Sequence, residues 1–116
     1  MSIQNKIKLD GGEFILKYIS PDEVFSPEDF SEEQKMIKDT VIEFIDREIW
    51  PQKMRFEEKD YDLTVEMMKK IGDLGLLGVN VDQNYGGLGM DFVSTMLVCD
   101  YISGSSGSLA TAYGAH

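Results

Sequence analysis

The sequence has one cysteine, Cys99, and one histidine, His116, among its 116 residues. A single cysteine excludes an internal disulfide framework, and one residue of each type is too few for a zinc site of the usual kinds. A Ser-His-Asp catalytic set is not expected either, because no chain follows the only histidine. We therefore predict no metal site in this chain.

The sequence also lacks a run of about 18 apolar residues, which a membrane-spanning helix requires. Its first residues, Met1 to Lys6, lack the apolar core of a signal peptide. Basic residues are in the minority, 11 against 21 acidic ones, which gives a net charge of −10. Nucleic acids and anionic membranes both select positive charge, so neither is an expected partner. The expected location is the cytoplasm.

What is present is typical of one folded domain, with 42% hydrophobic and 28% charged residues. Two Ser-Pro pairs, Ser20-Pro21 and Ser26-Pro27, are each followed by acidic residues and predict helix starts. Their spacing leaves room for a single turn between them. The segment before them, residues 13–19, fits either a short strand or an extended arm.

The first long helix is the clearest predicted element. Ser31 to Gln34 form a capping-box pattern at its start. Apolar residues then recur at helical spacing, at Ile37, Val41, Phe44, Ile45 and Ile49. Pro51 predicts a break or kink near Trp50, followed by a charged connector over residues 54–60.

Three further helices complete an all-α fold. The second begins near Asp62 or Thr64 and ends at Gly75 in a left-handed cap. It presents Val65, Met68 and Ile71 on one face, with Met67 and Leu74 beside them. Residues 76–81 are predicted to be extended and buried, and residues 82–89 form a loop. The third helix runs from Asp91, its N-cap, to about Ser103. After a turn over residues 104–107, a fourth begins near Ser108.

The loop over residues 82–89 is rich in glycine and invites a nucleotide-binding interpretation. Gly86, Gly87 and Gly89 follow Tyr85, but the dinucleotide motif needs a sixth-position glycine where this sequence has Phe92. The phosphate-binding Walker pattern fails as well, because no lysine follows the loop. We therefore interpret these four residues as a structural loop whose backbone turns closely.

The C-terminal segment is the most informative part of the sequence. After Asp100 no residue is formally charged, and small residues dominate. Leu109, Tyr113 and His116 share one helical face, which suits either an apolar pocket or packing against another helix. A helix without a polar face is expected to be buried, here against polypeptide that this chain does not contain. The alternative is that these residues form a frayed tail. We expect a fragment that is truncated within its fourth main helix.

Several short motifs, taken in order, resemble the acyl-CoA dehydrogenase family. They are Phe30-Ser31-Glu32-Glu33-Gln34, the segment Ile71 to Val79, the loop Tyr85 to Gly89, and Tyr113-Gly114-Ala115-His116. One departure is Asp82, where the family usually has proline. The resemblance implies that residues 1–25 are an N-terminal arm, similar to that of the very-long-chain branch. Residues 26–116 would then be the family's N-terminal helical domain.

The resemblance also implies a function for the intact protein. Members of the family have a helical domain, a β-domain and a helical bundle. They bind FAD and oxidise fatty acyl-CoA thioesters in β-oxidation. A glutamate far downstream acts as the base, and electrons pass to an electron-transferring flavoprotein. This chain should therefore hold no catalytic residue and no FAD, and it should be inactive alone. A homo-oligomer is expected.

By position, the resemblance implies that the last helix lines the acyl-chain pocket. The expected lining residues are Leu109, Ala110, Tyr113, Gly114 and His116. Tyr113 would lie near the floor, so that Tyr113→Ala in the intact enzyme favours longer acyl chains. The alternative function is a free-standing helical module that binds a protein partner through its apolar C-terminal helix.

Overall fold

A computed structural model describes residues 8–116, and in this range the chain forms helices and turns but no strand. The predicted all-α class is therefore confirmed. The chain divides into two compact units, Met1–Ser31 and Glu32–His116. Among the described residues, no helix is long and apolar enough to cross a membrane.

The first unit is built from short 3₁₀ turns, which span Glu13–Ile15, Pro21–Glu23 and Pro27–Asp29. The strand considered for residues 13–19 is wrong, because Gly12, at φ 87°, turns the chain into the first 3₁₀ turn. The two Ser-Pro turns are confirmed. In each, an acidic side chain three residues on accepts a hydrogen bond from the serine amide, at 2.7 Å for Glu23 and 2.9 Å for Asp29.

The second unit begins with α1 (Glu32–Phe44), whose predicted apolar stripe is buried along its whole length. Pro51 does not end the helical path. A π-helical turn (Ile45–Ile49) and a 3₁₀ turn (Trp50–Gln52) lead into α2 (Lys53–Glu57). Pro51 lies at the start of its 3₁₀ turn, where its missing N–H costs little. The connector expected over residues 54–60 is therefore partly helical, and Phe56 of α2 is buried.

The next helix, α3 (Tyr61–Asp73), has Asp60 as its N-cap. Its buried face is Leu63, Met67 and Ile71, spaced by one helical turn. The predicted face was therefore wrong for Val65, which is 54% exposed. Two parallel apolar stripes fit a helical period here, and only the packing against other helices decides which one turns inward.

After α3 the chain reverses in a compact turn rather than an extended stretch. Gly75 adopts the predicted left-handed conformation, at φ 78°. A 3₁₀ turn (Leu76–Gly78) follows where residues 76–81 were expected to be extended. Leu76 and Val79 are buried, so the expected burial is confirmed at these two positions.

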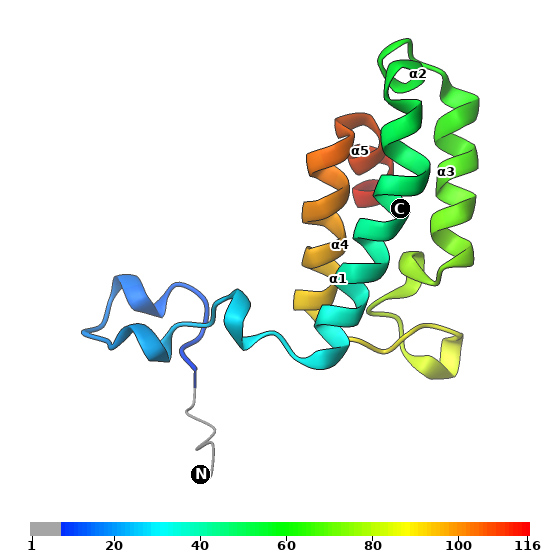
Figure 1. Ribbon diagram of the computed structural model, residues 1–116. Helices are drawn as coiled ribbons and strands as arrows, with labels where there is room; N and C mark the ends of the chain where they lie inside the picture. The colour runs from blue at the N-terminus through cyan, green and yellow to red at the C-terminus, as the bar shows by residue number, and fades with distance from the viewer. Residues whose placement is uncertain (1–7) are drawn as a thin grey trace. The chain divides into compact units, whose positions relative to one another are not determined.

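Two consecutive helices, α4 (Phe92–Ser105) and α5 (Gly107–Ala115), end the chain. Asp91 caps α4 as predicted, and the turn expected over residues 104–107 narrows to Ser106, which caps α5. α4 packs against both α1 and α5, and α3 packs against α5. In Figure 1, α1 and α4 lie side by side and run in the same direction, and α3 runs in the opposite direction.

Candidate functional site

The helix α5 has one face that belongs to the core of its own domain. Leu109 is fully buried and Tyr113 is 3% exposed. The Tyr113 hydroxyl donates a hydrogen bond of 2.6 Å to the carbonyl oxygen of Leu76, in the turn after α3. Burial, with a smaller contribution from Cys99, raises the pKa of Tyr113 to about 12. Of the two roles that their spacing allowed, an apolar pocket or packing against another helix, Leu109 and Tyr113 are found in helix packing.

His116 lies on the same side and is exposed. Its Nε2 atom lies 2.8 Å from the Leu77 carbonyl oxygen, and its Nδ1 atom contacts the carbonyl oxygen of Tyr113. The imidazole and the Tyr113 ring are 4.9 Å apart between centroids. The last predicted site residue is therefore tied to the turn that follows α3.

The other face of α5 consists of very small side chains. Gly107, Ala110, Thr111 and Gly114 follow one another at intervals of three, one and three residues, which places them on one face. A Cβ atom added at Gly107 or at Gly114 would meet no other residue within 4 Å. The Thr111 hydroxyl is turned back to the Gly107 carbonyl oxygen, at 2.9 Å. This face therefore lets an apolar group approach the helix backbone closely.

The structure divides the predicted pocket residues between two faces of α5. Ala110 and Gly114 lie on the small-residue face, whereas Leu109 and Tyr113 lie on the packed face. The sequence analysis placed Gly107 in the turn before this helix, and it counted Thr111 among the small residues of the helix without naming it as a pocket residue. The signal was available, since both lie at helical spacing from Ala110 and Gly114.

An open apolar groove of about 480 Å³ runs between α3 and α5, and sequence reasoning missed it entirely. Val65, Met68, Leu77 and Ala112 supply its apolar lining. The exposed position of Val65 follows from this groove, because no side chain of the described chain covers it. No pattern within one helix reveals a groove that two helices form together.

The glycine loop has a backbone reason for its composition. Gly86 and Gly89 adopt positive φ angles of 84° and 64°. A Cβ atom on Gly87 would lie 2.0 Å from the Val81 carbonyl oxygen. The amides of Gly87, Leu88 and Gly89 already donate to carbonyl oxygens of this segment, at 3.2, 2.9 and 2.8 Å. Tyr85 is exposed at the edge of the loop.

These amide contacts bear on FAD, the cofactor that the resemblance implies. A loop binds a phosphate through free backbone N–H groups. Because the amides at residues 87–89 are already paired, this loop does not fit the pyrophosphate of a dinucleotide.

A second polar feature joins two helices at their starts. Asp91 accepts hydrogen bonds from the Ser94 amide at 2.9 Å and from the buried Gln34 side chain of α1 at 2.7 Å. Partial burial acts to raise the pKa of Asp91, but the hydrogen bonds from Ser94 and Gln34 outweigh it and lower the pKa. The pattern identified Asp91 as a cap, but it did not reveal its bond to Gln34.

The described residues offer little other chemistry. Among residues 8–116, no group of three or more histidine, cysteine or acidic side chains is placed to hold a metal ion. Cys99 is half-buried, and burial raises the pKa of its thiol. The acidic pairs near the N-terminus serve turns and ion pairs. The Lys8 ammonium, for example, lowers the pKa of Asp29.

The fold, the capped helices and the glycine loop together define a class of protein. Residues 31–116 match the family model described as "Acyl-CoA dehydrogenase, N-terminal domain". The chain therefore belongs to the acyl-CoA dehydrogenase family, and it corresponds to the N-terminal helical domain of that fold.

Individual relatives agree with this assignment. The chain is 39% identical over 106 residues to a probable acyl-CoA dehydrogenase of Bacillus subtilis, covering 91% of this chain and 18% of the relative. It is 36% identical over 87 residues to the mitochondrial isovaleryl-CoA dehydrogenase of Bos taurus, covering 74% of this chain and 20% of the relative. The chain thus spans about a fifth of the length of these relatives.

A solved structure supports the fold. The crystal structure of an acyl-CoA dehydrogenase complexed with FAD from Bacillus anthracis is 42% identical, with a TM-score of 0.81. The similarity covers 93% of this chain and 18% of that one. The chain therefore shares the helical arrangement of one part of a much larger enzyme.

Proposed function

We propose that this chain supplies the N-terminal helical domain of a flavin-dependent enzyme that dehydrogenates fatty acyl-CoA thioesters. Within it, the small-residue face of α5 forms one wall of the acyl-chain pocket. The observation that carries this proposal is the open space at Gly107 and Gly114, on a helix whose opposite face is packed. The relatives support the acyl-CoA class, and the FAD complex from Bacillus anthracis supports flavin in the intact enzyme.

The wall acts by shape and by excluding water. Each methylene group of a substrate that leaves water for an apolar pocket gains about 0.8 kcal/mol. Small side chains keep space for these groups beside the helix, so the size of residue 114 limits how much acyl chain fits. The expected pocket roles of Leu109, Tyr113 and His116 remain predictions. The catalytic base, electron transfer to a flavoprotein partner and homo-oligomer formation belong, in this proposal, to parts of the enzyme outside this chain.

The test uses a chimera, in which this chain replaces the matching segment of the Bacillus subtilis relative. In it, Gly114→Val should lower kcat/KM for long acyl-CoA substrates about tenfold more than for short ones, because the valine displaces roughly two methylene groups. The control is Gly104→Val. Gly104 is also an open helical glycine, but it faces a groove between the end of α1 and α4. An unchanged ranking of kcat/KM across chain lengths would exclude the pocket role.

Gly114 is a cleaner site for this test than Tyr113. Replacing Tyr113 with alanine would remove a core side chain together with its hydrogen bond to Leu76, and so would change stability and pocket shape at once. At Gly114 the added side chain meets no other residue of this chain.

The alternative, a free-standing binding module, is favoured by one observation. The groove between α3 and the C-terminal helix α5 is open and has an apolar lining, which offers a surface to a protein partner. The chimera separates the two functions. A chimera that retains flavin and oxidises acyl-CoA supports the enzyme domain, whereas one that does neither supports the binding module.

A further inference from the structure

The first unit contains a loop with a preformed shape, which we call the arm loop (residues 8–25). Its two ends are held together by polar contacts. The Leu9 amide donates to the Glu23 carbonyl oxygen at 3.0 Å, and the Lys8 ammonium donates to the Asp22 carbonyl oxygen at 2.8 Å. Because the ends are fixed, the residues between them are presented in a defined arrangement, which lowers the entropic cost of binding.

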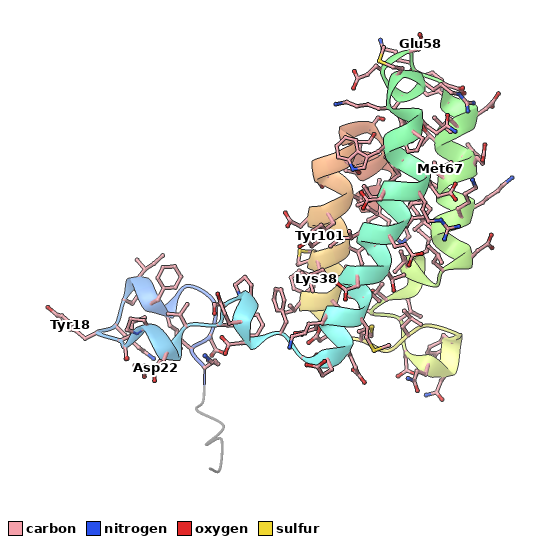
Figure 2. The ribbon with its side chains drawn as sticks, in the orientation of Figure 1. Tyr18, Asp22, Lys38, Glu58, Met67 and Tyr101 are labelled. Atoms are coloured by element: carbon pink, nitrogen blue, oxygen red, sulfur yellow. The ribbon has the colours of Figure 1, made fainter. Side chains whose placement is uncertain are left out.

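The far end of this loop, the arm tip (Phe14–Tyr18), is apolar and exposed. Ile15 is 74% and Leu16 is 85% exposed, and Phe14 is half-exposed. Tyr18 points away from the rest of the loop (Figure 2). The one charged residue in the tip, Lys17, is paired with Glu13. Several adjacent exposed apolar side chains on an ordered loop are typical of an interaction site.

The arm tip lies outside the domain that defines the family, but within the regions shared with two relatives. The family match begins at residue 31. A match of 106 residues leaves only ten of 116 out, so the Bacillus subtilis match includes the arm tip wherever it begins. The Bacillus anthracis structure covers 93% of the chain, so the arm tip lies within that similarity too.

These two relatives are longer than the others. The 106 matched residues are 18% of the Bacillus subtilis relative, so it has about 590 residues (106 divided by 0.18). The Bos taurus isovaleryl-CoA dehydrogenase has about 435 (87 divided by 0.20). A Bacillus subtilis relative that matches 86 residues has about 390 (86 divided by 0.22). The shorter relatives match only about three quarters of this chain. Similarity through the arm tip therefore accompanies some 150 additional residues.

We propose that the arm tip docks on the additional segment that the long relatives have and the short ones lack. That segment would present an apolar depression to Ile15 and Leu16. This inference rests on the proposed function, because the segment is part of the larger enzyme. It explains why an ordered loop exposes apolar residues, and why similarity to the loop extends to the long relatives.

The experiment compares two chimeras, in which this chain replaces the matching segment of the long Bacillus subtilis relative or of the short Bos taurus enzyme. The test variant carries Ile15→Asp and Leu16→Asp, and the matched control carries Ile15→Val and Leu16→Met. We expect the test variant to lower the Tm of the long chimera by about 5 °C, because two buried apolar contacts are lost. The control should not shift it, and the short chimera and the isolated chain should keep their Tm values in every variant.

Three outcomes would overturn the proposal. They are an unshifted Tm in the long chimera, an equal shift in both chimeras, and self-association of the isolated native chain that the test variant abolishes. The last outcome would assign the arm tip to a second copy. If the long chimera does not retain flavin, the same substitutions at the aligned positions of the native Bacillus subtilis relative decide the question. If the long chimera is active but the test variant does not lower its Tm, only the docking is contradicted. If the test variant lowers the Tm but the chimera is inactive, only the proposed function is contradicted.

Discussion

Two adjacent residues of α5 have different roles, and these roles follow from the sizes of their side chains. Tyr113 fills the core and bonds to the Leu76 carbonyl oxygen, whereas Gly114, one position later, leaves open space outside the helix. A rotation of about 100° per residue places them on different faces. The two faces of α5, a helix without formally charged residues, therefore differ in the size of their side chains rather than in polarity.

The first prediction concerns the Tyr113 hydroxyl. Tyr113→Phe should lower the free energy of unfolding of the 116-residue chain by about 1–2 kcal/mol, because the Leu76 carbonyl oxygen loses a buried donor. Urea unfolding at pH 7 measures this change. Tyr85→Phe is the control, since Tyr85 is 85% exposed, and it should leave the midpoint unchanged.

The same residue predicts a pH dependence. The folded pKa of Tyr113 is about 12, above the unfolded value of about 10, so the folded state holds its proton more tightly. The stabilisation is complete below pH 10 and is lost as the pH rises from about 10 to 12. Urea midpoints should therefore fall over this range in the native chain and fall less in Tyr113→Phe. Equal slopes in the two proteins would contradict the assignment.

At the scale of elements, the starts of α1 and α4 are joined through one carboxylate. Asp91 caps α4 through the Ser94 amide and also accepts from Gln34 of α1, a residue 57 positions earlier. A residue that serves only as a cap stabilises its own helix, but Asp91 also fixes where two helices meet. Its removal should therefore cost more than the loss of an ordinary cap.

The element-scale prediction is that Asp91→Ala lowers the free energy of unfolding by about 2 kcal/mol. The loss combines a helix cap with the hydrogen bond that Asp91 accepts from the buried Gln34 side chain. Ser106→Ala removes only a cap, that of α5, and should cost about 1 kcal/mol. Urea unfolding of both variants at neutral pH gives the comparison, and equal losses would show that the Gln34 contact contributes nothing.

The Asp91 effect should depend on pH in a defined direction. The pKa of Asp91 is lowered in the folded state, so its contribution is present above the ordinary pKa of about 3.9. It is lost as the pH falls below that value through the folded pKa. The difference between the native chain and Asp91→Ala should therefore shrink in acid.

At the scale of the whole molecule, this chain is a helical domain preceded by an arm. It covers about a fifth of the length of its relatives, and among its described residues no group of three or more histidine, cysteine or acidic side chains is placed to hold a metal ion. In the proposed enzyme, further polypeptide covers the exposed Phe92 and Met96 of α4 and the groove between α3 and α5. Its task in the proposed enzyme is to shape a pocket rather than to carry out the chemistry.

The whole-molecule prediction is that the isolated chain, supplied with FAD and acyl-CoA, shows no flavin reduction. The physical reason is the paired amides of the glycine loop and, by resemblance, a base located in another part of the enzyme. Anaerobic absorbance at the flavin band measures it, with the native Bacillus subtilis relative as the positive control. Bleaching of the band by the isolated chain would contradict the assignment.

The sequence by itself determined the all-α class, the long stripe of α1, the Asp91 cap and the family. These features are local or periodic, since a cap, a left-handed glycine and a helical repeat act over a few neighbouring residues. The resemblance implied which residues of the last helix line a pocket, and helical spacing placed Leu109, Tyr113 and His116 on one face, but neither could separate a pocket role from helix packing.

Only the tertiary structure decided which of two apolar stripes on α3 turns inward, with Leu63 buried and Val65 exposed. It also turned residues 76–78 into a 3₁₀ turn and paired Gln34 with Asp91 and Tyr113 with Leu76. Each of these features depends on residues that are distant in the sequence and that meet only after the helices pack. The arm tip is the reverse case, because its order comes from contacts within the arm loop, while the segment on which we propose it docks lies outside this chain.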